Sequence, residues 1–421
     1  MLILTAWLAL AAAPLRAQAV STPTAAVSET ADLERCYGWA KEQSESLHMQ
    51  MEQIFQLEQQ YKQALAAALP NIGFNASDKW LAPGGAGVYT TPQPQVNLTL
   101  SQPLFTGLRE FAAMAASKHQ QQASDLQLKH AHTALYQDVS SAFYLILNLE
   151  GQLANTMAAM DLSESRIQEL RHWVDLGKSR HSEVVLVESQ KATYEAQSEA
   201  LRGQIAVARD LLSFLTGRDL TAMKLTDRVE RVRGLDPEDP ILARAQTRAD
   251  VQALHKQVLA QEDQVRIAKG AWAPTVSFLG DYYFKRMTSL DTIKWDAGIT
   301  ASLPLFSGGG QLAAVRQAKS QESQAQYNYE LGLRQARSQI HSAYNTLRAS
   351  VSQAAAAEKA YSKANESYTL QLKEYRLGLV SNLDVLTAIN SLLSAKLTFD
   401  QVVVQSKLDL LLLKVATEEL P

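Results

Sequence analysis

The residue types that most often do chemistry are present in the chain, but their spacing does not assemble a reactive site. Its one cysteine, Cys36, has no second cysteine to pair with, so the sequence holds no disulfide framework. His130 and His132 are the closest two of the eight histidines, but side chains two residues apart on a helix face different ways. No Gly-x-Ser-x-Gly context and no glycine-rich phosphate loop is found. We therefore predict that the protein is not an enzyme and uses no metal or other cofactor.

Two carboxylates, Glu183 and Asp384, are placed where their charge has a physical consequence. Each follows a short glycine-containing turn and falls at the predicted start of a helix. A carboxylate in the first turn of a helix stabilises the positive end of the helix dipole, which is the ordinary role of such a residue. Lys178 and Arg180 lie beside Glu183 and would partly cancel its field, so its charge is expected to matter less than that of Asp384.

The two carboxylates belong to an internal repeat. The segment Ser-Gln-Pro-Leu-Phe-Thr-Gly at 101–107 returns 201 residues later as Ser-Leu-Pro-Leu-Phe-Ser-Gly at 302–308. Gly177 and Gly378, both preceded by leucine, match at the same offset and are expected to supply the backbone freedom that ends a helix. We infer that the chain contains two tandem copies of one structural unit.

Each copy contains two segments that alternate apolar and polar residues with the period of a β-strand. The four segments lie at about 71–80, 96–101, 275–284 and 295–303. A sandwich sheet with one wet face would account for them, but the small polar residues on the second face favour barrel strands around a water-filled lumen. Four strands cannot close a barrel alone, and open edges are not viable in lipid, so the chain is expected to oligomerise.

The repeated motif marks the places where a strand gives way to a long helix. Its proline suits a strand end because proline cannot donate a ladder hydrogen bond, and its phenylalanine is expected to pack at the junction. The junction residues are Pro103, Phe105, Gly107, Pro304, Phe306 and Gly308. Trp80, Tyr282, Tyr283 and Trp295 are candidates for interfacial aromatic girdles or for a plain core.

Long helices follow both copies of the motif. No proline occurs over 107–174, and a helix of that length reaches roughly 100 Å. Its apolar residues recur at three-four spacing, which is the seam of a coiled coil. A helix of similar length is expected over 308–376, and each long helix should fold back at a turn, Leu176–Ser182 or Leu377–Leu383.

The start of the chain has the pattern of an export signal. An apolar stretch at 1–13 precedes Ala17-Gln18-Ala19, a small-x-small cleavage pattern. We predict a signal peptide at 1–19, followed by the repeats at 20–235 and 236–421. Beyond the signal no run of about 18 apolar residues occurs, so no transmembrane helix is predicted. With 40 basic and 43 acidic residues the chain is near neutral, which implies no nucleic-acid partner.

Together these motifs resemble the TolC-like outer-membrane efflux protein family. The doubled Pro-Leu-Phe-[Ser/Thr]-Gly at 103–107 and 304–308 is similar to the family's strand-to-helix junctions. The segment 375–386 has every fixed position of the family's turn pattern, Tyr-x-x-Gly-x-x-x-x-x-Asp-[Val]-Leu. A looser copy at 173–185 has Glu183 in place of the aspartate. The resemblance covers roughly residues 30 to 418.

The resemblance implies a mainly α-helical fold with a membrane β-barrel. Three chains would give four strands each to a twelve-stranded barrel, continued by a long α-helical coiled-coil tunnel through the periplasm. Such a homotrimer lies in the bacterial outer membrane, in contact with its lipid, and is the exit duct for efflux or type I secretion. It docks to a periplasmic adaptor (membrane fusion) protein. The adaptor links it to an inner-membrane transporter, proton-driven or of the ABC type, that supplies the energy.

The resemblance also gives the two carboxylates a second role. In the family the acidic residue after the tip turn lines the pore constriction, so Asp384, and in the first copy Glu183, would stand at the pore entrance. A ring of three such residues favours cations, and this role is compatible with stabilising the helix. Val380 and Thr387 stand where some family members carry charged gate residues. The gating mechanism is therefore the family property that applies least to this chain.

Two alternatives compete with a channel. A non-conducting structural or adhesive coiled-coil protein of the envelope would explain the helices but leaves the four alternating strands without a purpose. A helical enzyme would need a convergent polar constellation that the sequence does not display. The sequence names neither the cargo nor the partner pump and adaptor.

Overall fold

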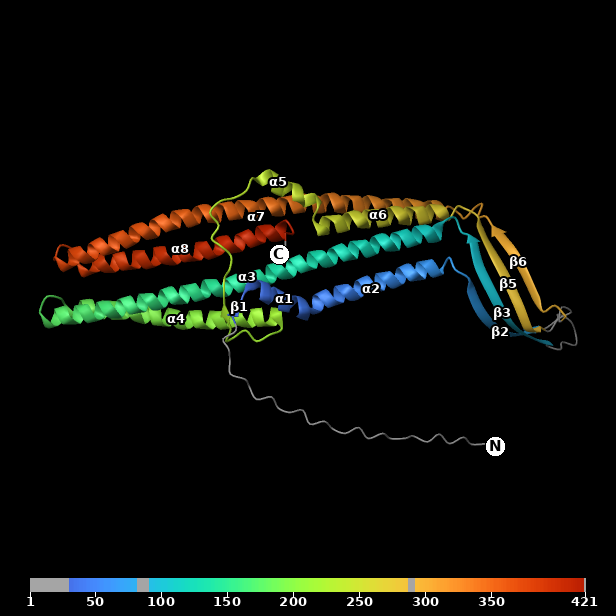
Figure 1. Cartoon of the computed structure of the whole chain (residues 1–421). Coiled ribbons are helices and arrows are strands. Elements are labelled where there is room, and N and C mark those ends of the chain that lie inside the picture. Colours follow the sequence, from blue (N-terminus) through green and yellow to red (C-terminus); the bar gives the residue numbers. More distant parts are fainter. Residues whose placement is uncertain (1–29, 82–90, 287–291, 420–421) are drawn as a thin grey trace, which may run out of the picture.

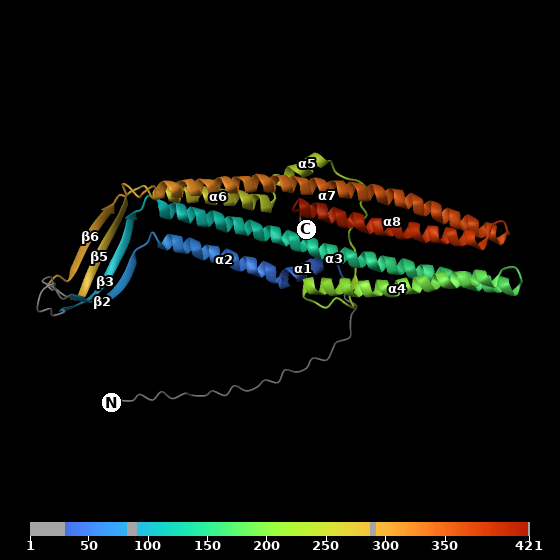
Figure 2. The same ribbon diagram turned by 180° about the vertical axis from the view of Figure 1, so that it is seen from behind.

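The computed structural model describes residues 30–81, 91–286 and 292–419. Within them the chain is long and narrow, with a four-stranded sheet at one end and two helical hairpins that reach the other (Figure 1). Figure 2 shows the same arrangement from behind. The predicted signal peptide at 1–19 lies outside the described residues.

The chain passes twice through the same order of elements. The first pass comprises β1 (Thr30–Ala31), α1 (Leu33–Gln43), α2 (Glu45–Ala66), β2 (Asn71–Leu81), β3 (Thr91–Phe105), α3 (Arg109–Asp175) and α4 (His181–Thr216). Then follow β4 (Lys224–Leu225), α5 (Glu238–Ala243), the 3-10 helix η1 (Arg244–Gln246), α6 (Ala249–Gly270), β5 (Thr275–Arg286), β6 (Trp295–Ser302), α7 (Gly310–Arg376) and α8 (Asn382–Ala416). Both passes contain a helix, two strands, a long helix and a returning helix. The repeat boundary at 235/236 stays a prediction.

The long strands form one antiparallel sheet in the order β2-β3-β5-β6. They lie where the alternation predicted strands, and β5 continues through Lys285 and Arg286 beyond the predicted segment 275–284. Phe74 pairs with Leu98, and Leu98 pairs with Tyr282, so these three side chains share one face. Because β3 and β5 come from different passes, their pairing joins the two halves of the molecule.

The apolar face of this sheet carries large exposed side chains. Eight of them are between 39% and 69% exposed: Ile72, Phe74, Trp80, Leu98, Tyr282, Phe284, Trp295 and Ile299. On the polar face Asn97 is only 6% exposed, and its side-chain amide donates to the Asp281 carboxylate at 2.6 Å. Tyr283 also lies on the polar face, against Arg286, so it cannot share a girdle with Tyr282. No part of the described chain covers the apolar face with a second layer.

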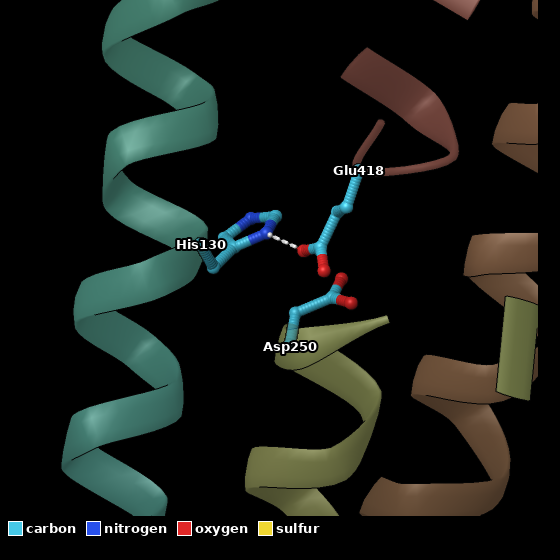
Figure 3. A group of neighbouring side chains, drawn as sticks. All are labelled: His130, Asp250 and Glu418. Carbon is cyan, nitrogen blue, oxygen red and sulfur yellow. Dashed lines mark hydrogen bonds and ion pairs between the residues drawn. The ribbon is translucent and has the colours of Figure 1, made fainter. Parts of the chain in front are cut away.

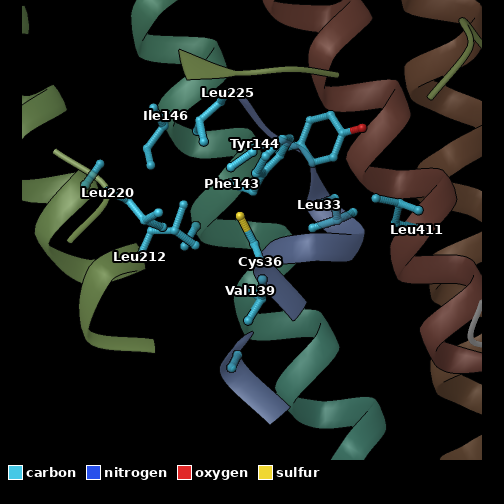
Figure 4. Close-up of a cluster of buried hydrophobic side chains, with 14 of the residues drawn as sticks. Leu33, Cys36, Val139, Phe143, Tyr144, Ile146, Leu212, Leu220, Leu225 and Leu411 are labelled. Carbon is cyan, nitrogen blue, oxygen red and sulfur yellow. The ribbon is translucent and has the colours of Figure 1, made fainter. Parts of the chain in front are cut away.

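The largest buried core lies at mid-length of the molecule, where α1, α3 and α4 meet (Figure 4). Cys36 and Phe143 are fully buried there, and Leu212 of α4 and Leu220 pack beside them. Burial is the main cause that raises the pKa of the Cys36 thiol to about 12. The thiol is therefore protonated at neutral pH and acts as an apolar core residue.

The segment between α4 and α5 crosses the helices and ties them together (Figure 1). Within it, β4 pairs in parallel with β1, a contact that the sequence analysis did not anticipate. Asp227 accepts hydrogen bonds from the Tyr144 hydroxyl of α3 at 2.9 Å and from the Lys407 ammonium of α8 at 2.7 Å. Arg231 reaches Glu358 of α7 at 2.8 Å. This segment therefore bonds to both hairpins.

The hairpin turns are shorter than predicted. α4 already begins at His181 and α8 at Asn382, so Ser182 and Leu383 belong to helices and not to turns. Gly177 (φ 65°) and Gly378 (φ 74°) take the left-handed conformation that ends the preceding helix. The second turn closes early because Ser381 caps α8: its hydroxyl accepts from the Asp384 amide while the Asp384 carboxylate accepts from the Ser381 amide.

The two strand-to-helix junctions differ in their packing. Pro103 and Phe105 lie at the end of β3, and Phe105 is 39% exposed. Pro304 and Phe306 follow the edge strand β6, and Phe306 is 89% exposed. Phe306 is therefore unpacked within one chain, because an edge strand has no neighbour on its outer side, and the expectation that both phenylalanines pack at a junction stays a prediction. None of the described helices is long and apolar enough to cross a membrane.

Gly107 and Gly308 occupy matching junction positions, so the same substitution at both separates the cost of backbone strain from the cost of a steric clash. Both have positive φ, 73° at Gly107 and 61° at Gly308. A methyl group at Gly107 would lie 2.3 Å from the Gly270 carbonyl oxygen, whereas nothing lies within 4 Å of one at Gly308. Gly308→Ala should cost about 1–2 kcal/mol for the left-handed backbone alone. Gly107→Ala should cost about 1–3 kcal/mol more because the end of α6 must move. Urea unfolding of the two variants measures the difference, and equal losses would show that Gly107 is not sterically constrained.

Candidate functional site at the hairpin tips

The turns of the two hairpins lie next to each other at the end of the molecule farthest from the sheet (Figure 1). All four hairpin helices contribute to one apolar cluster just behind the turns, and α3 and α8 pack along each other. Its buried members are Ile167, Leu170, Val184, Val187, Tyr375, Val385 and Ile389. The tip is therefore a packed four-helix unit that holds the turns in fixed positions.

Asp384 stands at the start of α8 with its side chain exposed. One of its carboxylate oxygens, Oδ2, accepts from the Ser381 hydroxyl at 2.6 Å and from the Ser381 amide at 2.8 Å. The Ser381 hydroxyl, followed by its amide, lowers the pKa of Asp384 because both hydrogen bonds stabilise the carboxylate form. Asp384 is thus a fixed negative charge at neutral pH, with its helix-capping contacts made.

Glu183, the corresponding residue of the first hairpin, is more enclosed. Its carboxylate accepts from the Ser179 hydroxyl at 3.0 Å and pairs with the Arg180 guanidinium at 3.4 Å. The Glu183 side chain is 21% exposed. Arg180 therefore offsets part of the negative charge of Glu183, as the sequence suggested. The two tip carboxylates consequently differ in the net charge that they present to solvent.

Arg166 is a tip residue that the sequence analysis missed. It lies on α3, is 3% exposed, and donates through Nε and Nη2 to the Asn382 side-chain oxygen of α8 at 3.2 and 2.7 Å. Its Nη1 donates to Glu169 at 2.7 Å, and its guanidinium lies 4.2 Å from the ring centre of Tyr375 on α7. A buried charge is tolerated only with such partners. Arg166 therefore bonds the first hairpin to both helices of the second.

Two further contacts extend this link. Tyr375 stacks on Trp173 of α3, with ring centres 5.0 Å apart. Glu169 also reaches the Arg376 guanidinium at 3.5 Å. The sequence contained one signal for the link: Arg166 follows Ser163 by three residues and precedes Leu170 by four, so a charge occupies the buried seam of α3.

A second polar group lies at mid-length, far from the tips. His130 of α3, Asp250 of α6 and Glu418, just after α8, each bring one potential ligand atom within 4.8 Å of the others (Figure 3). The hydrogen bond with Glu418 is the main cause that raises the pKa of His130. In the sequence His130 stands out only beside His132, because local spacing does not reveal partners on other elements.

Comparison with known proteins identifies the class of this fold. The family model described as "Outer membrane efflux protein" matches residues 37–218 and 243–410, and the chain belongs to this family. The resemblance found in the sequence motifs is thereby confirmed. This family consists of channel proteins and not of enzymes.

The relatives of this chain include outer-membrane proteins of efflux and secretion. It is 26% identical over 325 residues to the outer membrane efflux protein BepC of Brucella suis, covering 73% of this chain and 68% of that protein. It is 23% identical over 367 residues to the outer membrane protein TolC of Escherichia coli, covering 79% and 71%. It is 25% identical to the alkaline protease secretion protein AprF of Pseudomonas aeruginosa, covering 71% and 64%.

Solved structures share the fold at lower identity. The outer membrane protein VceC of Vibrio cholerae superimposes with a TM-score of 0.78 at 20% identity, covering 91% of this chain and 95% of that one. CusC superimposes with a TM-score of 0.81 at 18% identity, covering 91% of each chain. The mainly helical fold with its small sheet is therefore that of TolC-like channels.

The link at Arg166 can be tested against a surface arginine on the same helix. Arg166→Met removes the buried guanidinium and leaves Asn382 buried without its donor, so tip opening should become easier by about 3 kcal/mol. That corresponds to roughly hundredfold faster amide hydrogen exchange in the first turns of α8. Arg171→Met breaks the exposed Arg171–Glu188 pair and should cost less than about 1 kcal/mol. Exchange at α8 that is the same in both variants would contradict the link.

Proposed function

We propose that this chain is one subunit of an outer-membrane channel that serves as the exit duct for efflux or type I secretion. The observation that carries the proposal is the sheet, which exposes large apolar side chains on one face and holds the Asn97–Asp281 hydrogen bond on the opposite, polar face. A water-soluble sheet buries its apolar face, so this arrangement is typical of strands between lipid and a wet lumen. A non-conducting coiled-coil protein would have no use for such a sheet.

The edges of the sheet support a homotrimeric barrel. β2 and β6 each pair on one side only, and every residue of β6 is exposed. Unpaired strand edges are not tolerated in lipid, so another copy must satisfy them. A head-to-tail arrangement that pairs β6 of one subunit with β2 of the next closes into a ring. With three subunits, the number implied by the family resemblance, that ring has twelve strands.

The helices would continue the duct through the periplasm. α3 and α7 contain 67 residues each, so each extends about 100 Å away from the sheet. In a trimer, six such hairpins would surround one axis as a coiled-coil tunnel. The partners implied by the family are a periplasmic adaptor (membrane fusion) protein and an inner-membrane transporter, proton-driven or of the ABC type. That transporter supplies the energy, since this chain carries no nucleotide-binding motif.

The tips would form the periplasmic entrance. Three copies of Asp384, exposed and ionised, would form a ring that attracts cations and repels anions. Glu183 would contribute less because Arg180 neutralises it locally. The Arg166 link lies directly behind, since its partner Asn382 is two residues before Asp384. Opening of the entrance would then require the two hairpins of a subunit to separate at this link.

The two faces of β3 provide a test of the barrel. Leu98 is on the exposed apolar face, and Leu98→Arg should impair assembly in the outer membrane because arginine at the lipid midplane costs about 2–4 kcal/mol. Thr99, next in the chain, is on the polar face and contacts Asp281. Thr99→Arg should assemble, pair with that carboxylate and change the conductance. Heat-modifiable migration of outer-membrane fractions measures assembly, and equal damage from both variants would refute lipid on one face and lumen on the other.

The entrance ring is tested by removing one charge per subunit. Asp384→Asn should lower cation preference in planar bilayers and weaken block by multivalent cations, because the ring loses its field where the duct is narrowest. Glu183→Gln is the matched control and should shift the reversal potential less. If Asp384→Asn channels keep the reversal potential of the unmodified protein, the carboxylate only caps α8 and does not line the entrance.

A further inference from the structure

We propose that His130, Asp250 and Glu418 form a binding site for a divalent transition-metal ion of the Zn²⁺ class at mid-length of the helical region. The three side chains come from the middle of α3, the start of α6 and the residue just beyond the end of α8. They point toward one another (Figure 3). A metal ion there would fasten three elements that are distant in the sequence.

The donor atoms and their separations suit such an ion. One imidazole nitrogen and two carboxylate oxygens are ligands that zinc and its neighbours in the periodic table accept. His130 Nδ1 and Glu418 Oε1 are 3.0 Å apart. Two ligands at about 2.0–2.1 Å from one metal are separated by roughly 3 Å, so this pair already has the spacing of a shared ion. The Asp250 carboxylate lies within the same 4.8 Å group.

Neighbouring groups already orient the two carboxylates. The second oxygen of Glu418, Oε2, accepts from the Ala249 amide at the start of α6, which leaves Oε1 directed at His130. Both Asp250 oxygens accept from Arg248, at 3.0 and 2.7 Å. Hydrogen bonds of this kind to carboxylate ligands fix their direction in metal sites. Arg248 supplies one positive charge against two negative ones, so the site retains a net attraction for a cation.

The backbone at Glu418 indicates that this side chain is held in place at a cost. Its φ is 56°, the left-handed conformation that is usually left to glycine after a helix. Its side chain is only 5% exposed although it is a carboxylate at the end of the described chain. A strained residue that directs a buried charge into a polar cluster is an established mark of a functional position.

Access and space for water are also present. A cavity of about 520 Å³ adjoins the cluster and is lined by His130, Arg248, Asp250 and, from α7, the uncharged Ser338, Gln339 and Ser342. It gives an entry path for a hydrated ion and room for the water molecules that would complete its coordination. The facing residues of α7 add no positive charge that would repel the ion.

The test uses the full-length protein, purified in detergent, stripped with a chelator and titrated with Zn²⁺ by calorimetry. We expect one ion per chain, and at least tenfold weaker binding in His130→Ala and in Glu418→Gln. Glu418→Gln keeps the size of the side chain and one acceptor oxygen for the Ala249 amide, so it remains informative if His130→Ala does not fold. His341→Ala is the matched control: His341 also contacts a glutamate, Glu238, but belongs to no group of three ligands among the described residues.

The outcomes separate a metal site from an ion-pair cluster. Binding lost in both site variants and kept in His341→Ala supports the proposal, as does a Zn²⁺-dependent rise in the unfolding temperature that the same two variants abolish. Absence of stoichiometric binding, or equal binding in all variants, overturns it and leaves a His–carboxylate cluster that only ties α3, α6 and α8 together. The measurement requires no conduction, so its failure would leave the proposed channel untouched.

Discussion

The pairing of β3 with β5 is the interaction on which the rest of the structure depends. These strands come from different halves of the chain, and their register places Phe105 beside Val276 at the point where the helical region begins. From there α3 leaves the sheet with its first turn close to the end of α6, where Gly107 has no room for a side chain beyond hydrogen. This ladder thus sets where α3 starts relative to α6, and the pairing of β5 with β6 extends the same sheet to the strand that precedes α7.

Helices of 67 residues need further ties along their length, since a small sheet at one end cannot fix the other. The molecule has ties at two levels. At mid-length, a buried core surrounds Cys36 and Phe143, and Asp227 bonds to both α3 and α8. At the far end, Arg166 holds Asn382 and Tyr375. Apolar burial contributes at both levels, since a buried cluster that includes Leu170 and Val385 lies beside the Arg166 contact at the far end.

Polar and apolar groups are distributed differently in the two parts of the molecule. In the sheet, large apolar side chains are exposed on one face, while Asn97 and Asp281 share a hydrogen bond on the other. In the helical region the order is the usual one, with Ile146 and Leu170 buried and most charges exposed. The change occurs at the strand-to-helix junctions, where the repeated Pro-Leu-Phe motif stands. Phe306 is exposed there in the single chain.

The sequence by itself determined the elements: alternation of period two located all four long strands, the absence of proline located the long helices, and glycine at 177 and 378 marked both turns. These features follow from local backbone preferences, so neighbouring residues suffice to reveal them. Even there, the turn ends were misplaced because the Ser381–Asp384 capping box closes the second turn early. Only the tertiary structure decided which strand pairs with which, that Arg166 is buried against Asn382, and that His130 meets Asp250 and Glu418. Apart from the β2–β3 and β5–β6 pairings, those contacts join residues more than a hundred positions apart, and no local pattern encodes which distant side chain a folded helix will bring near.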